Sequence, residues 1–173
     1  MNFQLRGQHR FTLSILLIAW LTGCGTKPKL PELPPVLPIE KLIEKPMPQL
    51  TMRIAATADA NRDPEGKPLA VVVRVYELKS HGVFTKADFF SLYDRESAVL
   101  GGDLIIRDEV TLAPQQFLPI SRPLNPDATY IGVVAAFRDI DHSQWRDLIH
   151  LNPLQNNNLQ IEVGAANVSI RHH

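Results

Sequence analysis

The chain has 173 residues, one cysteine and 14 prolines, and its 18 basic residues balance its 18 acidic ones. This length suits a single domain with its own core. Nucleic-acid and anionic-surface binding both depend on a marked basic excess, so the even charge argues against either class of partner. A lone cysteine permits no disulfide within the chain, so the core must hold the fold unaided.

The first 23 residues have the layout of a signal peptide. Residues 1–10 are polar and basic without one acidic residue, and an apolar run of eleven residues follows over 11–21. Such a run is a signal-peptide core, because a membrane-spanning helix needs about 20 apolar residues. The run ends in Leu21-Thr22-Gly23-Cys24, which resembles the lipobox of bacterial lipoproteins. An ordinary secretory signal with an incidental cysteine and a buried N-terminal helix are the alternatives.

Residues 24–49 are predicted to form the lipidated N-terminus and a proline-rich tether. Cleavage before Cys24 leaves 150 residues with 16 basic and 18 acidic side chains, and half of the chain's prolines lie in residues 25–49. Proline fixes φ and biases its predecessor toward extended backbone, so this tract favours polyproline II and spans on the order of 80 Å when fully extended. The alternative is that its apolar residues, Leu37, Ile39, Leu42 and Ile43, pack along the following domain.

From residue 50 the apolar pattern has the period of two that indicates half-buried β-strands. Residues 129–137 are apolar on both faces and predict a central strand, whereas Pro119 marks a short edge strand. The alternation slips at residues 107–109, which indicates a turn or bulge. The predicted strands are residues 50–58, 69–78 (with Leu69, Val71, Val73 and Val75 on one face), 103–112, 116–120, 129–137, 144–151 and 158–163, with 167–170 prolonging the last.

One helical segment interrupts the strands. Thr85 and Asp88 have capping-box spacing, an aromatic and apolar stripe follows, and Gly101-Gly102 provides a stop. We therefore expect a helix over residues 86–99. Seven or eight short strands with turn signals between them predict an all-β protein, an antiparallel β-sandwich with this helical segment inserted, over residues 50–173.

Two polar stretches are candidate functional sites. The loop joining the first two predicted strands contains both charge signs, two prolines that limit its conformational freedom, and a glycine suited to its tip; its residues are Asn61, Arg62, Asp63, Pro64, Glu65, Gly66, Lys67 and Pro68. By itself this pattern is typical of a solvated hairpin connection.

The second stretch contains Asp139, Asp141 and His142, which would suit a metal ligand set or an acid–base pair. These residues lie in a polar turn, where aspartate is favoured for local backbone hydrogen bonds. The remaining histidines near the C-terminus, His150, His172 and His173, are isolated or terminal. The sequence therefore predicts no catalytic residue, no metal and no cofactor.

Several blocks together are similar to one family, the TssJ outer-membrane lipoproteins of the type VI secretion system. The resemblance extends from the lipobox to the last strand. The blocks are Val73-Arg74-Val75-Tyr76-Glu77-Leu78-Lys79, Phe84, Ala87-Asp88-Phe89-Phe90-Ser91-Leu92-Tyr93, Leu100-Gly101-Gly102-Asp103-Leu104, Ile131-Gly132-Val133-Val134-Ala135-Ala136-Phe137-Arg138-Asp139 and Trp145-Arg146.

This resemblance implies a transthyretin-like β-sandwich with an inserted helix and a lipid on Cys24. Gly25 after the lipidated cysteine implies sorting to the outer membrane, with the domain on the periplasmic face. The implied role is to anchor a membrane complex by binding the periplasmic C-terminal domain of the inner-membrane protein TssM, alongside TssL. In the family the loop between the first two strands contributes to that contact, and it corresponds here to residues 61–67.

Two other functions stay open from the residues alone. A periplasmic small-ligand carrier requires a concave pocket with a few converging polar groups, such as an apolar cavity between the sheets. A periplasmic hydrolase requires that Asp139, Asp141 and His142 converge with polar residues from elsewhere in the chain.

Overall fold

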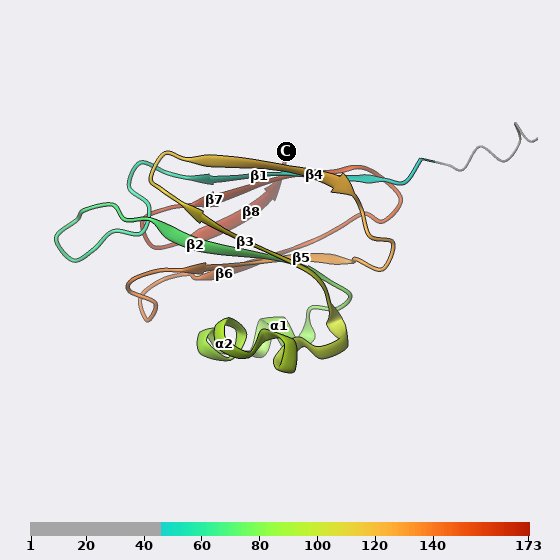
Figure 1. Ribbon diagram of the computed structural model, residues 1–173, viewed down its shortest axis with the longest axis horizontal. Helices are drawn as coiled ribbons and strands as arrows, with labels where there is room; N and C mark the ends of the chain where they lie inside the picture. The colour runs from blue at the N-terminus through green and yellow to red at the C-terminus, as the bar shows by residue number, and fades with distance from the viewer. Residues whose placement is uncertain (1–45) are drawn as a thin grey trace, which may run out of the picture. The chain divides into compact units, whose positions relative to one another are not determined.

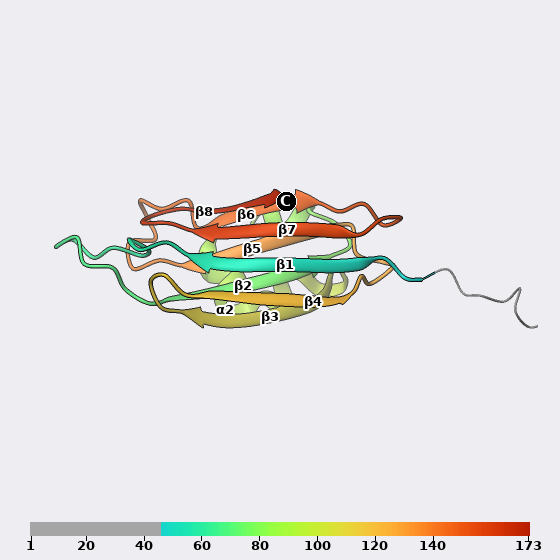
Figure 2. The ribbon, with the colours of Figure 1, turned by 90° about the horizontal axis from the view of Figure 1, so that it is seen from above.

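The computed structural model describes residues 46–173, so the predicted signal peptide, Cys24 and most of the tether lie outside the described residues. In the described part, eight strands form two four-stranded sheets that face each other (Figure 1). The strand orders are β4-β1-β7-β8 and β3-β2-β5-β6, and Figure 2 shows the first sheet from above. The predicted β-sandwich with an inserted helical segment is confirmed.

The strands lie close to their predicted positions. They are β1 (Gln49–Ala56), β2 (Val71–Leu78), β3 (Leu104–Leu112), β4 (Phe117–Pro123), β5 (Tyr130–Ala136), β6 (Arg146–His150), β7 (Asn157–Val163) and β8 (Val168–His172). Every neighbouring pair is antiparallel except β1 and β7, which are parallel. A parallel pair needs a long crossover connection, and the chain between β1 and β7 includes the whole second sheet.

Alternating apolar residues fill the space between the sheets. Val71, Val73 and Val75 of β2 and the alternate residues Leu50 and Met52 of β1 are buried in this core. β-Branched side chains suit such a pleated, close-packed surface. As predicted, the strand containing Pro119, β4, is an edge, and the strand with two apolar faces, β5, lies inside its sheet.

The predicted interruption at residues 107–109 is wrong, because β3 runs through them and the register shift lies near Leu104, opposite Leu78. The alternation looked broken because the inward position between Ile106 and Val110 carries an acid, Asp108. Arg122 of β4 reaches this carboxylate (2.7 Å) and the fully buried Glu77 of β2 (2.7 Å). Two carboxylates therefore enter the sandwich paired with one guanidinium, the condition under which buried charge is tolerated.

The last predicted strand does not prolong its neighbour. The chain reverses at Gly164, whose amide donates to the Asn167 carbonyl (2.8 Å), and β8 returns antiparallel to β7. This reversal produces the eighth strand.

The helical segment consists of two helices, not one. α1 is Gly82–Lys86 and α2 is Phe89–Leu100, separated by Ala87 in an extended conformation. The predicted capping role of Thr85 is wrong, since Thr85 lies inside α1, and Asp88 is the N-cap that accepts from the Ser91 amide (2.9 Å). Arg146 explains the break, because its Nη1 donates to the carbonyls of Phe84 (2.9 Å) and Ala87 (2.6 Å), which no helix hydrogen bond uses.

Both helices cover the outer face of the β3-β2-β5-β6 sheet (Figure 1). Phe84 of α1 is buried against Gly132 of β5, where an added Cβ would lie 2.6 Å from the ring. Glycine is therefore needed at this position for the helix to approach the sheet. A second apolar cluster fills the space between the helices and this sheet, and it includes Tyr76, Leu92 and Val134.

Candidate functional site

The β1–β2 loop, residues 57–70, projects from one end of the sandwich (Figure 1). β1 begins at Gln49 at the opposite end and runs its full eight residues before the loop starts. At about 3.3 Å per residue, the strand separates the two ends by roughly 26 Å. The chain therefore enters the domain at one end and presents this loop at the other.

Backbone hydrogen bonds hold the base of the loop to the β7–β8 turn. The amide of Thr57 donates to the Val163 carbonyl (2.9 Å), and that of Arg62 donates to the Ala165 carbonyl (3.2 Å). The Thr57 carbonyl in turn accepts from the amide of Gln115 in the β3–β4 loop (3.2 Å). The base is thus part of the sandwich and not a free hairpin.

Asn61 is buried, unlike the other residues predicted to contact a partner. It has a positive φ of 50°, a conformation that asparagine tolerates better than most residues. Its Nδ2 donates to the Ala70 carbonyl (2.8 Å), and its Oδ1 accepts from the amide of Arg138 in the β5–β6 loop (2.7 Å). Asn61 therefore positions the loop from inside, and the accessible side chains are those of residues 62–67.

The tip of the loop is a closed turn from Asp63 to Lys67. The Asp63 amide donates to the Lys67 carbonyl (3.0 Å), and the Asp63 carboxylate accepts from the Lys67 amide (2.8 Å). Gly66 has a φ of 85°, a conformation that favours glycine and agrees with its predicted place at the tip. The exposed side chains of Arg62 and Glu65 give the turn both charge signs. Arg62 also forms an ion pair with Asp59 (3.1 Å).

A shallow hollow of about 350 Å³ lies between this tip and the β5–β6 loop, residues 137–145. It is lined by Arg62, Asp63 and Pro64 on one side and by Arg138 and Asp139 on the other. Arg138 was not predicted as a neighbour of the loop. No local pattern could reveal it, because the link runs through Asn61, 77 residues away in the chain.

Asp139 and His142 contact each other, with Nδ1 of the imidazole 2.8 Å from the carboxylate. Both are exposed, and the hydrogen bond to Asp139, assisted by its charge and that of Asp141, raises the pKa of His142. Within residues 46–173 no group of three His, Cys, Asp or Glu side chains is arranged to hold a metal ion. The cluster is an exposed pair in a loop, and of its two side chains only Asp139 borders the hollow that Arg62 and Asp63 line.

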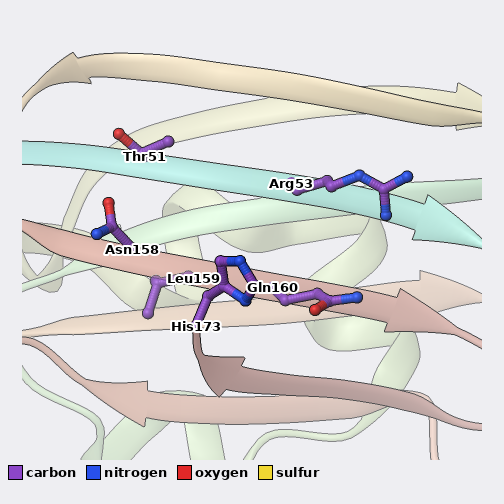
Figure 3. Close-up of a pocket in the computed structure, with 6 residues that line it drawn as sticks. All are labelled: Thr51, Arg53, Asn158, Leu159, Gln160 and His173. Carbon is purple, nitrogen blue, oxygen red and sulfur yellow. The ribbon is translucent and has the colours of Figure 1, made fainter.

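Another hollow, of about 380 Å³, lies on the outer face of the β4-β1-β7-β8 sheet (Figure 3). Thr51 and Arg53 of β1 line it beside their register partners Asn158 and Gln160 of β7, and His173 borders it. This hollow is a solvent-facing depression on the outer face of the sheet and is not a cavity between the sheets. Core side chains fill the space between the sheets, so the apolar cavity that would favour the small-ligand alternative finds no support there.

In residues 46–173 there is no helix with the length and apolar character needed to cross a bilayer. Membrane attachment through Cys24, which lies outside these residues, stays a prediction.

Comparisons with known proteins agree with the fold and the sequence blocks. The family described as type VI secretion lipoprotein, VasD, EvfM, TssJ, VC_A0113, matches residues 48–166. The T6SS lipoprotein TssJ1 from Pseudomonas aeruginosa is 32% identical with a TM-score of 0.71, covering 74% of this chain and 98% of that one. No curated protein matches the chain.

Two further structures concern assemblies. A chain in a structure described as "Type VI membrane complex" is 30% identical (TM-score 0.63; 73% of this chain, 99% of that one). A chain in a structure described as "T6SS protein TssM C-terminal domain (869-1107) from EAEC" is also 30% identical (TM-score 0.59; 71% and 97%). With 119 matched residues in the family comparison and a match that covers 98% of TssJ1, this chain belongs to the TssJ family of type VI secretion lipoproteins.

Proposed function

We propose that this protein is a lipid-anchored structural component of the type VI secretion membrane complex, held at the periplasmic face of the outer membrane. In this role it binds the periplasmic C-terminal domain of TssM through the β1–β2 loop, in a complex that also contains TssL. The observation that carries the proposal is the structure of this loop. It is a charged turn fixed by hydrogen bonds, and it lies at the end of the domain opposite the start of β1.

The structural relatives support this choice of partner. The match to the chain in the TssM structure covers 71% of this 173-residue chain and 97% of that one. That chain is therefore much shorter than residues 869–1107 of TssM, and it resembles TssJ. A TssJ-like chain that accompanies a TssM domain is the arrangement expected if the two bind each other.

The physics of the loop also favours a binding role. Binding has an entropic cost for every flexible segment that it orders, and a loop that is already fixed avoids most of that cost. Here the Asp63–Lys67 turn and the Asn61 bridge fix the loop before any partner arrives. The exposed side chains of Arg62, Glu65 and Lys67 then offer charges of both signs for selecting a partner.

The anchor and the loop act together in this proposal. A lipid on Cys24 would hold the protein at the membrane, and more than one acyl chain is needed for stable attachment. The tether of residues 24–49 would set how far the domain stands from the membrane. Anchoring raises the local concentration of the domain for its partner, which strengthens binding without any new contact.

This role requires no catalysis, metal or cofactor. Its support is the exposure of the Asp139–His142 pair, because both side chains are open to solvent. Replacing Asp139 by asparagine and His142 by glutamine together should leave secretion unchanged. Loss of secretion with TssM binding intact would favour the hydrolase alternative.

The loop is tested by replacing residues 62–67 with a short Gly-Ser turn while Asn61 is kept. The full-length chain in detergent is titrated calorimetrically with the periplasmic C-terminal domain of TssM. We expect the wild type to bind and the replacement to lose binding with an unchanged unfolding temperature, because Asn61 still ties the base of the loop. Full affinity in the replacement would exclude the loop from the interface.

The anchor is tested separately by mass spectrometry of the processed protein and by membrane fractionation. We expect lipid on Cys24, and we expect Cys24→Ser to release the protein from the outer-membrane fraction. An unmodified sulfur or a retained leader would overturn the anchor while leaving the loop titration intact.

A further inference from the structure

A third hollow, the aromatic groove, lies between the start of α2 and the β5–β6 loop. Its volume is about 390 Å³, and we define it by Phe89 and Phe90 of α2, Trp145 and Ile140 beyond β5, and two carboxylates, Asp88 and Asp141. None of these side chains belongs to the β1–β2 loop. The groove is therefore a distinct surface of the molecule.

The aromatic side chains of the groove are held in place by one another. Phe89 meets both Phe90 and Trp145 edge-on, with ring centroids 5.4 Å apart in each case, and stacks on Tyr93 at 5.1 Å. Phe90 nevertheless remains 62% exposed. Phe90 is not an isolated apolar residue, because it lines the groove together with Phe89 and Trp145, and grouped apolar surface with polar residues at its rim marks interaction sites.

The charge of the groove specifies what it would bind. Asp88 and Asp141 are both exposed, and among residues 46–173 neither forms an ion pair with a cationic group. The oxygens of Asp88 already accept from the amide (2.9 Å) and the hydroxyl (2.6 Å) of Ser91, so Asp141 is the more available of the two carboxylates.

Carboxylates beside an exposed aromatic ring complement a lysine or arginine side chain, because the ammonium or guanidinium group pairs with the acid and its charge is attracted to the ring face. Arg146 already lies over the Trp145 ring, 4.7 Å from its centroid, so the exposed Phe90 is the ring that an incoming cation would contact. The stem of the same side chain would cover apolar surface.

The groove is also continuous with the end of the sandwich that carries the β1–β2 loop. Asp141 lies in the β5–β6 loop, and Asn61 ties that loop to the β1–β2 loop through the Arg138 amide (2.7 Å). Both loops lie at the same end of the domain (Figure 1). A partner seated on the tip of the β1–β2 loop is therefore close to the groove as well.

We propose that the aromatic groove is a second contact surface for that partner, and that it receives a segment presenting a lysine or arginine side chain beside an apolar one. This inference rests on the proposed function. It predicts two separable contributions to one interface, one from the loop tip and one from the groove.

The test is a titration of the full-length chain in detergent with the periplasmic C-terminal domain of TssM, using Phe90→Ser and Asp141→Lys. Phe117→Ser is the matched control, because Phe117 is an aromatic residue of similar exposure (53%) on the other sheet. Each groove variant should weaken binding roughly tenfold, the loss typical of an interface residue that matters. The effect of Asp141→Lys should shrink at high salt, and Phe117→Ser should bind like the wild type.

The outcomes separate the two proposals. If the wild type does not bind TssM, the proposed function and this inference fall together. If the wild type binds and both groove variants stay within twofold of it, the groove is excluded while the proposed function stands. If sedimentation shows that Phe90→Ser abolishes self-association and leaves TssM binding unchanged, the occupant is a second copy and this inference is wrong. Asp141 lies in an exposed loop, so its variant tests the groove even if Phe90→Ser fails to fold.

Discussion

The two sheets of this sandwich differ in what covers their outer faces. The face of β3-β2-β5-β6 lies beneath α1 and α2 and is aromatic and apolar, whereas the face of β4-β1-β7-β8 is open to solvent and carries Thr51, Arg53 and Gln160 (Figures 1 and 3). Much of the sequence resemblance to the family falls on the covered side, in Phe84, Asp88, Gly132 and Arg146. Those residues attach the helices to the sheet, so this part of the resemblance concerns the scaffold.

The largest expected effect lies at the covered face. Replacing Phe84 by alanine empties the buried site between α1 and β5. Loss of a buried phenylalanine side chain typically costs about 3–5 kcal/mol, so the free energy of unfolding in urea should fall by that order. A loss below about 1 kcal/mol would show that the helices are not integral to the fold.

Gly132→Ala approaches the same contact from the other side. The added Cβ would lie 2.6 Å from Cζ of Phe84, so the ring or the strand must move. Overfilling a well-packed core costs about 1–3 kcal/mol, and the double variant with Phe84→Ala should recover part of that cost because the ring is gone. Simple additivity of the two losses in urea unfolding would contradict the contact.

On the open face the equivalent change should be nearly silent. Gln160 lies on the exposed side of β7 and is replaced by valine, which suits a strand. The expected change in the free energy of unfolding is within about 0.5 kcal/mol. A large destabilisation would mean that this face is not open, and the contrast between the two sheets would be lost.

The smallest effect concerns His142, which lies in the β5–β6 loop and on neither face. The hydrogen bond that the imidazole donates to Asp139 raises its pKa above the usual 6.5. The pair therefore contributes its stability fully below pH 6.5, and that contribution is lost as the pH rises through the raised pKa. An NMR titration should show the pKa of His142 returning toward 6.5 in Asp139→Asn; an unchanged value would rule out the pair.

The features that the sequence predicted correctly depend on local patterns. Alternation located β2, Pro119 identified an edge, and Gly66 marked the loop tip. The errors came from residues whose role depends on distant partners. Asp108 interrupts the apolar alternation of β3, and it can face inward because Arg122 of β4 pairs with it. The break between α1 and α2 depends on Arg146, about sixty residues further along the chain.

The candidate site also has features that local sequence predicts and features that it does not predict. The mixed charge and the restricted backbone of residues 62–67 can be read from composition. The burial of Asn61 cannot be predicted from composition, because it depends on hydrogen bonds to Arg138 and Ala70 and on a positive φ that many asparagines do not adopt. The aromatic groove likewise joins residues about fifty positions apart, from Phe90 to Asp141.

The central claim is that the tip of the β1–β2 loop binds the periplasmic domain of TssM. Hydrogen–deuterium exchange of the full-length protein with and without that domain tests it most directly. We predict slower exchange of the backbone amides of residues 62–67 in the complex, with β1 and β7 on the open face unchanged. Unchanged exchange in residues 62–67, with new protection on β1 and β7, would contradict the account.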